Sequence, residues 1–595
     1  MGKVIVSMEK WFVAAKKADF NAWSKKFNIT PVTARIIRNR DILSEEEVEK
    51  YLYGTYLDMY PPELMLGMED AAAIMAESIA LKKKIRVIGD YDVDGITSSH
   101  ILMKGLQVLG GNVDTVIPHR MKDGYGLNDR LIEDAYEAGI QTIITCDNGI
   151  AAASQIALAV EKKMTVVVTD HHEVPYVEEN GVRTEILPPA AVVVDPKQAD
   201  CKYPNPGICG AVVAYKLIEL MFRKSKVSYE ERQACMEEFM QLAAVATVCD
   251  VMDLLDENRI IVKEGLKRIR KAPCMGLKAL IEANGVEPSK LNAFHLGFVI
   301  GPCLNATGRL DSAVRALELL RAKDAISAAR IAGELKEMNE SRKAMTLQGV
   351  KQAAEQIEKE HLSEDKVLVI FLPDCHESLA GIIAGRVKEQ YGKPTFVLTR
   401  GEEGLKGSGR SIESYHMYDA MVACRELFTK FGGHKMAAGL SLEEKNLEEL
   451  RRRLNTQCTL TEEDFQPKVH IDVPMPLAYA TRQLAEEFEI LEPFGNANPK
   501  PLFATKNVVF QFGRKMGKQG TFAKYTVTQE GKTYELVFFG GLDKFHAYLD
   551  GKFGEGASGR LYEKECEFPL SVTYRIGLNS FRGKTELQLL MENYQ

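Results

Sequence analysis

Five short runs of apolar, mostly β-branched residues place the strongest constraint on how the first half of this 595-residue chain can fold. They are IRVIGD (85–90), TVIPH (115–119), TIITCD (142–147), TVVVTD (165–170) and AVVVD (191–195). Helical stretches separate the runs, and strands buried on both faces of a parallel sheet have this character. The sequence therefore predicts an α/β domain.

The rest of the chain divides by changes of pattern, and its length suits three or four folding units. The segment at 324–360 has no Pro and only two Gly, Gly333 and Gly349, which predicts long connecting helices. VLVIFL (367–372) begins a smaller α/β unit, and the tail from Pro501 alternates as the strands of an OB-like barrel do. We expect an N-terminal helical element (1–70), the first α/β domain (71–323), connecting helices (324–360), a second α/β domain (361–445), and a helical stretch with the barrel (446–595).

The composition is that of a protein without membrane spans, because no apolar run approaches the ~18 to 20 residues needed to cross a bilayer. The N-terminus shows no signal-peptide pattern, so we expect a cytoplasmic location. Eleven cysteines without a C-x-x-C pair predict reduced thiols rather than disulfides or a zinc site. The net charge of −7 disfavours a nucleic-acid binder only weakly, since carboxylates gathered around metal ions would lower it.

Three of the aspartates that end the predicted strands are candidates for a site: Asp90, Asp147 and Asp170. Ligands of parallel sheets bind beyond the carboxyl ends of the strands, so these carboxylates are expected to converge. Asp92 and Asp94 follow Asp90 at alternate positions of a predicted loop, and His171 and His172 follow Asp170. Mixed carboxylate and imidazole ligands suit Mn²⁺ or Mg²⁺, and two such ions are suited to phosphoryl chemistry.

Each of these motifs has a simpler alternative. DYDVDG opens like an EF-hand loop, but the twelfth position is Ile101 instead of a bidentate Glu, and a strand precedes the motif instead of a helix. DHH alone would more often be a helix-capping Asp with two packed histidines, although its place after TVVVT favours a site. Asp250, which ends the apolar run in ATVCD, would alone more often be a surface or capping carboxylate.

The ordered set GDYDVDG, TCDNGI, TDHH and ATVCD resembles the four metal-binding motifs of the DHH phosphoesterase superfamily. Within it, IPHRMKDGYGLN, GPCLNATGRLDSA, CHESLAGIIAGRV, KGSGRS and FGGHKMAAG are similar to the RecJ family of exonucleases, including its DHHA1 domain and OB-like tail. The resemblance runs from about residue 35 to the C-terminus. It departs from the family pattern at Cys375, Ser378 and Asp195.

This resemblance implies two divalent ions, with Mn²⁺ favoured and Mg²⁺ possible, held by Asp90, Asp92, Asp94, Asp147, His171 and Asp250. It implies that Asp147 and His171 are also catalytic, and that His172 contacts the scissile phosphate. It assigns DNA phosphates to Arg309, Ser408, Arg410 and His434. An isolated Arg is usually solvated or ion-paired, and Gly-Gly is usually a turn, so these assignments have weaker support.

The function implied is 5′-to-3′ release of 5′-mononucleotides from single-stranded DNA threaded through a cleft, in recombination and repair. A monomer that binds a single-strand-binding protein would fit the family. Two other functions stay open: a phosphodiesterase for short oligoribonucleotides or cyclic dinucleotides, and an inactive binding protein. The extra barrel disfavours the first, and the intact acidic set disfavours the second. Aromatic residues of the tail either stack bases or form the barrel core: Phe510, Phe512, Phe522, Tyr525 and Tyr534.

Overall fold

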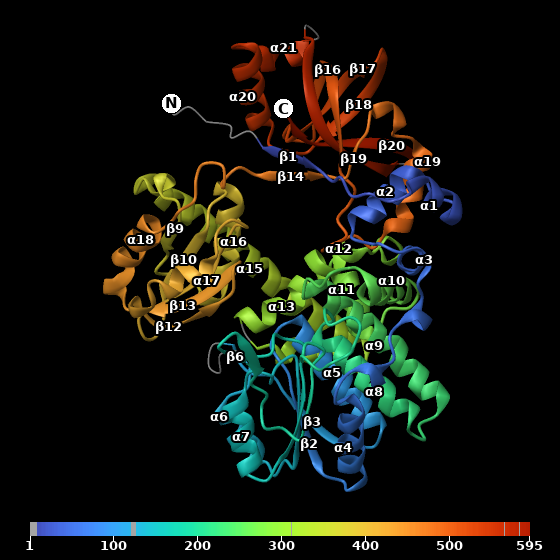
Figure 1. The fold of residues 1–595 in the computed structure, drawn as a ribbon, viewed down its shortest axis with the longest axis vertical. Helices are drawn as coiled ribbons and strands as arrows, with labels where there is room; N and C mark the ends of the chain where they lie inside the picture. The colour runs from blue at the N-terminus through green and yellow to red at the C-terminus, as the bar shows by residue number, and fades with distance from the viewer. Residues whose placement is uncertain (1–8, 121–125, 311, 564–565, 582) are drawn as a thin grey trace.

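The computed structural model describes residues 9–120, 126–310, 312–563, 566–581 and 583–595. Figure 1 shows a parallel-sheet domain at the bottom, a smaller α/β domain at the left and a β-barrel at the top. The first described residues and the C-terminus lie beside the barrel. Within the described residues, no helix has the length and apolar character that crossing a membrane requires.

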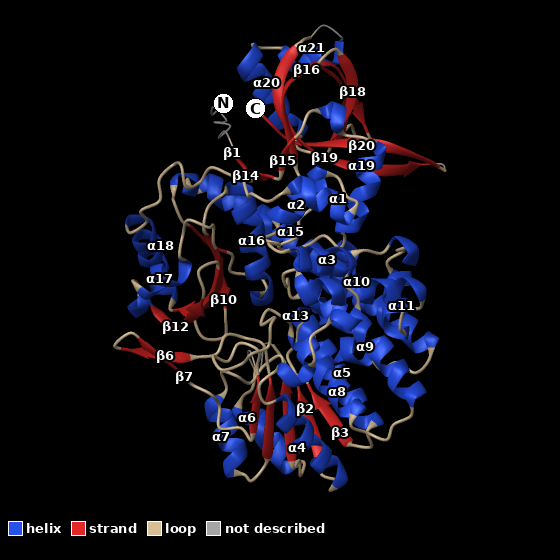
Figure 2. Cartoon of the chain, turned by 45° about the vertical axis from the view of Figure 1, so that its right-hand side comes forward, coloured by secondary structure: helices blue, strands red, loops and turns tan. Residues whose placement is uncertain are grey.

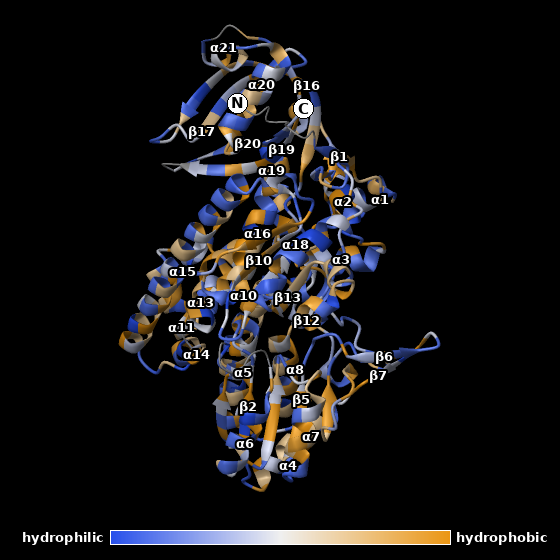
Figure 3. Ribbon diagram, turned by 90° about the vertical axis from the view of Figure 1, so that its left-hand side faces the viewer, coloured by the Kyte–Doolittle hydropathy of each residue, from blue (hydrophilic) through white to orange (hydrophobic). Residues whose placement is uncertain are grey.

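The sheet of the first domain has five parallel strands in the order β3 (Asn112–Val116), β2 (Lys84–Ile88), β4 (Thr142–Cys146), β5 (Thr165–Thr169) and β8 (Val192–Val194). Val87 and Val167 face one hydrophobic core, whereas Ile88 and Val168 face another. Helices α4 (Met68–Ala80), α5 (Val93–Val108) and α8 (Gly210–Arg223) supply the first core, and α6 (Asp129–Glu137) and α7 (Ala153–Glu161) supply the second. Strands β4 and β5 are almost completely buried, and Figure 3 shows hydrophobic stretches in this sheet, so burial on both faces is confirmed.

Two details of this sheet differ from the sequence prediction. The second strand ends at Val116, before Pro118, which lacks the N–H that a ladder needs. The connection from β5 to β8 is a hairpin, β6 (Tyr176–Glu179) and β7 (Val182–Glu185), so the helical stretch expected there is wrong. Asn180 and Gly181 form its turn with φ of 54° and 78°, which is the backbone that a tight hairpin turn requires.

The second half of this domain is helical: α9 (Tyr229–Cys249), α10 (Asp256–Lys271), α11 (Met275–Ala283), α12 (Ala293–His295), the π-helical turn η4 (Leu296–Ile300), α13 (Gly301–Leu310) and α14 (Val314–Leu320). The predicted connecting helices are one helix, α15 (Ala325–Lys359), capped by Asp324. Its 35 residues span about 50 Å. Leu335 packs into the core of the first domain and Ile357 into that of the second, so α15 joins the two.

The second domain has a mixed sheet in the order β12 (Phe428–Gly433), β13 (Ala437–Leu442), β11 (Leu405–Arg410), β10 (Thr395–Arg400) and β9 (Leu368–Phe371). Only β9 and β10 of this sheet pair in parallel, and α16 (Ala380–Tyr391) connects them. Two further helices complete the domain, α17 (Met417–Val422) and α18 (Leu447–Thr456), and α18 buries Leu450 and Leu454 in its core.

The C-terminal strands form a closed barrel of β16 (Phe503–Met516), β17 (Phe522–Gln529), β18 (Lys532–Phe538), β20 (Lys584–Tyr594) and β19 (Phe568–Phe581), because β19 pairs back with β16 (Figure 2). Helices α20 (Leu542–Phe553) and α21 (Ala557–Glu563) lie beside it. Of the aromatic candidates, Phe510 and Tyr525 are buried core residues. Phe512, Phe522 and Tyr534 are partly exposed.

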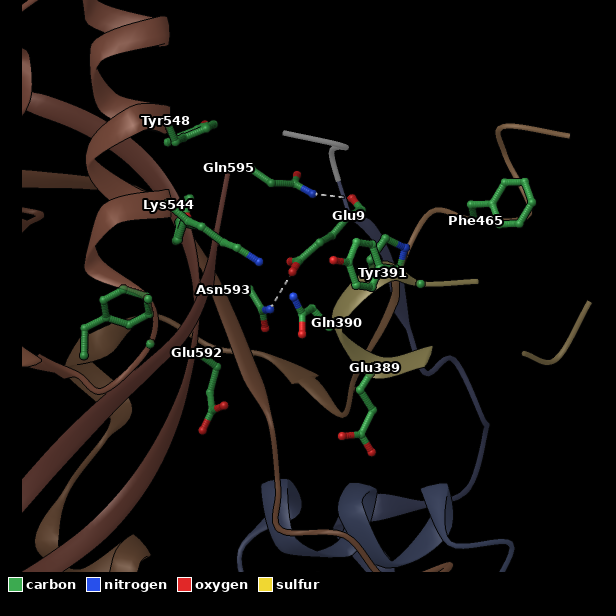
Figure 4. Close-up of a pocket in the computed structure, with 16 residues that line it drawn as sticks. Glu9, Glu389, Gln390, Tyr391, Phe465, Lys544, Tyr548, Glu592, Asn593 and Gln595 are labelled. Atoms are coloured by element: carbon green, nitrogen blue, oxygen red, sulfur yellow. Dashed lines mark hydrogen bonds between the residues drawn. The ribbon is translucent and has the colours of Figure 1, made fainter. Parts of the chain in front are cut away.

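The N-terminal helices are an integral part of the C-terminal unit. Helices α1 (Phe20–Phe27), α2 (Pro31–Asn39) and α3 (Glu45–Tyr53) share a hydrophobic core with the barrel, to which Trp23 and Ile37 contribute. Strand β1 (Lys10–Val13) pairs with β14 (Lys468–Ile471). Gln595 Nε2 donates to the Glu9 carbonyl at 2.7 Å, and Asn593 donates to the Glu9 carboxylate at 2.9 Å (Figure 4). These contacts line a pocket of about 520 Å³ between the barrel and the end of α16.

A buried arginine fastens the first domain to this unit. Arg259 of α10 donates to the carbonyls of Tyr51 (2.8 Å), Ile490 (2.9 Å) and Leu491 (2.9 Å), and its guanidinium lies 3.9 Å from the Tyr51 ring centroid. The three carbonyls come from α3 and from the segment that leads into the barrel. A buried carbonyl needs a donor, and this one side chain serves three carbonyls of the junction.

We expect Arg259→Ala to lower the free energy of unfolding of this unit by about 3 kcal/mol, because buried carbonyls lose their donors. Urea unfolding followed by fluorescence would measure the change, since both tryptophans, Trp11 and Trp23, lie in the affected unit. Lys267→Ala, at an exposed position of the same helix, is the matched control. Equal unfolding midpoints for the two variants would contradict this role.

Candidate metal centre

The first acidic motif lies where β2 ends and α5 begins. Asp90 follows the strand, and Asp92 caps the helix by accepting a hydrogen bond from the Gly95 N–H at 3.0 Å. Asp94 lies in the first helical turn, so the expectation that all three aspartates occupy a loop is wrong for Asp94. Because Asp92 caps the helix, α5 begins before Asp94, and the amino end of a helix favours negative charge.

Asp94 is fully buried and is held by the start of a second helix. Its two carboxylate oxygens accept hydrogen bonds from the backbone N–H groups of Gly210 (2.6 Å) and Ala211 (2.7 Å) in α8. Position 210 has no room for a side chain, because a Cβ there would lie 2.9 Å from Asp147 Cβ and 3.1 Å from Asp94 Oδ2. Gly210 thus allows α8 to approach the acidic cluster.

His171 lies among three carboxylates from different elements. Its Nε2 is 3.0 Å from Asp147 Oδ1, 3.4 Å from Asp94 Oδ2 and 3.6 Å from Asp250 Oδ2. Asp147 follows β4 in the left-handed region, with φ of 58°. Asp250 is the C-cap of α9, so the apolar run before it is a helix. The carboxylates of Asp94 and Asp147, which follow two strands, therefore lie together as expected. Asp250, at the end of α9, adds a carboxylate from a helix.

The ligand atoms form groups that could hold metal ions. Asp90, Asp92 and Asp147 form one group, and Asp94, His171 and Asp250 form another, with the ligand atoms of each group within 4.8 Å of one another. Asp147 lies next to both groups through its contact with His171. Asp147, His171 and His172 satisfy the same criterion.

The electrostatics of the cluster favour bound cations. Burial, and then the charge of Asp92, raises the pKa of Asp90 to about 8. Burial and the charges of Asp94 and Asp92 raise the pKa of Asp250 to about 8. Among the described residues, the buried atoms without a hydrogen-bond partner include Asp90 Oδ1, His171 Nδ1 and Asp250 Oδ2. Oxygen and imidazole donors with unused lone pairs suit Mn²⁺ or Mg²⁺, so the residues fit the ions that the sequence suggested.

Asp170, one of the strand-end aspartates expected to converge, orients His172; the sequence had assigned it no role in the site. It accepts hydrogen bonds from the Ile150 N–H (2.9 Å), the His171 N–H (2.8 Å) and His172 Nδ1 (2.8 Å). Burial lowers the pKa of His172, but the hydrogen bond to Asp170 and the nearby carboxylates outweigh it and raise the pKa to about 9. The ring is 42% exposed, and its raised pKa favours the protonated form beside the acidic cluster.

Four arginines meet where the two α/β domains touch. Arg309, at the end of α13, donates to the Ser378 carbonyl at 2.9 Å, and the Ser378 hydroxyl donates to the Arg309 carbonyl at 3.0 Å. Burial, and then the charges of Arg120, Arg342 and Arg410, lowers the pKa of Arg309 to about 10. Ser378, one of the departures from the family pattern, thus joins the two domains beside this cluster.

The other predicted phosphate-binding residues lie on strand β11 of the second domain or in the neighbouring turn. Ser408 and Arg410 lie two positions apart on β11, and both pack against Gly381, where a Cβ would lie 2.9 Å from Arg410 Nη2. His434 is exposed in the turn after β12, and its N–H donates to the carbonyl of Ala437, the β13 partner of Arg410.

The arginine cluster adjoins the acidic cluster through Tyr91, which lies between Asp90 and Asp92. The Arg120 guanidinium is 4.9 Å from the Tyr91 ring centroid. Helix α13 packs on the same loop, since Asn305 accepts a hydrogen bond from the Val93 N–H at 3.1 Å. Arg120 and Asn305 lie inside the motifs that carried the family resemblance, so this signal could have found them. Residues 121–125 and 311 of these motifs lie outside the described residues.

We expect Gly210→Ala to weaken Mn²⁺ binding by about tenfold or more, because the added Cβ displaces Asp147 or Asp94. Isothermal titration calorimetry would measure the affinity. Gly333→Ala is the matched control, since a Cβ at that position of α15 meets no atom within 4 Å. Unchanged Mn²⁺ affinity in Gly210→Ala would show that this close approach does not shape the site.

Comparisons with known proteins agree with this architecture. Three family models match: "DHH family, N-terminal domain" (84–247), "DHHA1 domain" (364–459) and "RecJ OB domain" (471–593). The single-stranded-DNA-specific exonuclease RecJ of Bacillus subtilis is 34% identical over 541 residues, which cover 90% of this chain and 66% of that protein. The protein of the same name from Salmonella typhimurium is 32% identical over 584 residues, covering 95% of this chain and 96% of its own length.

Solved structures are similar as well. RecJ from Thermus thermophilus in complex with Mn²⁺ matches with a TM-score of 0.79 at 26% identity, covering 98% of this chain and 79% of that one. The same protein in complex with Mg²⁺ gives a TM-score of 0.73 at 25% identity, covering 98% and 78%. The two α/β domains are therefore a DHH and a DHHA1 domain, the barrel is a RecJ OB domain, and the chain belongs to the RecJ family.

Proposed function

We propose that this chain is a metal-dependent exonuclease that degrades single-stranded DNA from the 5′ end and releases 5′-mononucleotides in recombination and repair. One observation carries the proposal. Two groups of metal-ligand atoms meet at Asp147, beside a cluster of arginines at the boundary of the DHH and DHHA1 domains. Hydrolysis of a phosphodiester in a nucleic acid is served by metal ions at the reacting oxygens and by cationic side chains that bind the phosphates.

In this proposal Asp90, Asp92 and Asp147 hold one ion, and Asp94, His171 and Asp250 hold the other. Mn²⁺ is favoured because one of the ligands is an imidazole, and Mg²⁺ is possible. The similar Thermus structures contain one or the other ion. Two bound ions supply an activated water molecule and stabilise the attacking and leaving oxygens.

The remaining residues hold the substrate. His172, kept cationic by Asp170, contacts a non-bridging oxygen of the scissile phosphate. Arg309 and Arg410 bind phosphate through paired N–H groups, and Ser408 and His434 add hydrogen bonds from the DHHA1 side. The pKa of Arg309 is lowered to about 10 by burial and by its arginine neighbours. This lowering indicates repulsion between like charges, which a bound phosphate would reduce.

The barrel favours this function over hydrolysis of short oligoribonucleotides or cyclic dinucleotides, because a longer strand needs an extended surface. The complete ligand set favours an enzyme over an inactive binding protein. A monomeric state and contact with a single-strand-binding protein stay predictions from the family resemblance.

Degradation of end-labelled substrates with Mn²⁺ tests the function. We expect early release of labelled mononucleotide from the 5′ end of single strands, and little from duplex or from a short oligoribonucleotide. Asp147→Asn should abolish cleavage while strand binding persists, because Asn keeps the shape and tolerates the left-handed backbone but loses the charge. Preference for the short RNA would support the alternative phosphodiesterase, and Asp147→Asn cleavage at the wild-type rate would refute the site.

We expect Arg410→Ala to weaken binding of a single strand and to reduce the slope of log affinity against log salt by about 0.7, as loss of one phosphate contact does. Fluorescence anisotropy over a salt series would measure both quantities. Arg400→Ala, on the adjacent strand β10 at the opposite end of its pairing with β11, is the matched control. An unchanged slope in Arg410→Ala would remove this arginine from the phosphate site.

A further inference from the structure

A pocket of about 760 Å³ lies between the helical half of the DHH domain and the barrel unit. The segment that follows Asp250 lines one side with Val251 and Met252. Helix α12, which faces the barrel in Figure 1, and the turn η4 supply Phe294 and Phe298. The approach to the barrel supplies Lys500 among other residues. The chain neighbours of Asp250, the helical half of the DHH domain and the barrel unit thus contribute to one surface.

Phe294 and Phe298 form an exposed aromatic pair. They are 61% and 67% exposed, and their rings stack with centroids 4.9 Å apart and an interplanar angle of 23°. Four residues apart on a helix, they present neighbouring faces to solvent. Two large aromatic side chains exposed together are uncommon on a surface without a ligand.

The pair is fixed to the helix that carries a metal ligand. The turn η4 is π-helical, a local form often found at functional sites. Its Gly297, together with Gly301, packs closely on the last turn of α9, where a Cβ at Gly297 would lie 3.2 Å from Val248 and one at Gly301 would lie 2.3 Å from Cys249 Sγ. The last turn of α9 ends at Asp250, so the aromatic pair has a fixed position relative to the metal centre.

The backbone after Asp250 is strained and is clamped to the barrel unit. Val251 is 65% exposed and has a φ of 59°, which a β-branched residue rarely adopts. Asn496 Nδ2 donates to the Val251 carbonyl (3.0 Å) and to Asp253 Oδ1 (2.7 Å), and the Asn496 carbonyl accepts from the Leu254 N–H (2.9 Å). The segment that follows Asp250 is therefore attached to the barrel unit at the pocket.

The charges at the pocket suit an anionic ligand with flat apolar faces. Lys500 is exposed at its rim, and Arg575 of β19 lies beside it, with its Nε 3.0 Å from Glu592. Stacked aromatic rings with cations at the edge are the elements by which proteins hold unpaired bases and their phosphates. A duplex, whose bases are already stacked and paired, offers no such faces.

We propose that Phe294 and Phe298 form a stacking platform for unpaired bases of the strand as it runs between the barrel and the metal centre. The platform rests on the proposed function and deepens it, because it adds a reason for preferring single strands. It accepts bases of any sequence, since every base has a π face.

The test compares Phe294→Ala/Phe298→Ala with wild type on a 20-nucleotide strand and on a dinucleotide, in Mn²⁺. We expect KM for the long strand to rise about tenfold with kcat little changed. KM for the dinucleotide should stay unchanged, because the dinucleotide is too short to reach the platform. The double substitution to Tyr should restore KM, whereas the double substitution to Leu should not, because stacking needs a ring. Tyr229→Ala, at an exposed position at the other end of α9, is the matched control.

Binding of the 20-nucleotide strand in an Asp147→Asn background, measured by anisotropy, separates the two proposals. A KM and an affinity within twofold of wild type in the double Ala variant, or full rescue by Leu, would overturn the platform while wild-type cleavage upholds the function. Failure of the wild-type protein to bind or cleave any single strand would overturn the proposed function and the platform with it.

Discussion

The crowding of carboxylates at one edge of the parallel sheet is the constraint on which the rest of the structure depends. Burial and mutual repulsion raise the pKa of Asp90 and Asp250 to about 8, so the cluster is costly to ionise without cations. The fold offsets part of this negative charge. The N–H groups of Gly210 and Ala211 donate to Asp94, and His172 is hydrogen-bonded to Asp170. What remains unbalanced is what two divalent ions would neutralise.

The other domains matter because they are attached around this edge at short range. Arg309 and Ser378 exchange hydrogen bonds between the DHH and DHHA1 domains, which brings an arginine cluster next to the metal ligands. On the other side, Arg259 and Asn496 join the DHH domain to the barrel unit. The proposed substrate-binding elements of three domains are thus positioned by hydrogen bonds to backbone carbonyls and N–H groups, which leave little freedom at the junctions.

Local sequence pattern predicted the features that local physics determines. Buried strands followed by aspartate and the long helix α15 both follow from short-range rules. The hairpin β6–β7 was missed although Asn180 and Gly181 signalled its turn. The union of the N-terminal helices with the barrel could not be predicted, because it depends on contacts between residues more than 400 positions apart. The orienting role of Asp170 likewise follows only from three-dimensional contacts.

The most direct test of the account is anomalous diffraction from crystals grown with Mn²⁺. Two peaks about 3.5 to 4 Å apart are expected, one beside Asp90 and Asp92 and the other beside Asp94, His171 and Asp250, with Asp147 in contact with both. A single ion, or ions that Asp147 does not contact, would contradict the claim that this carboxylate cluster is a two-metal centre.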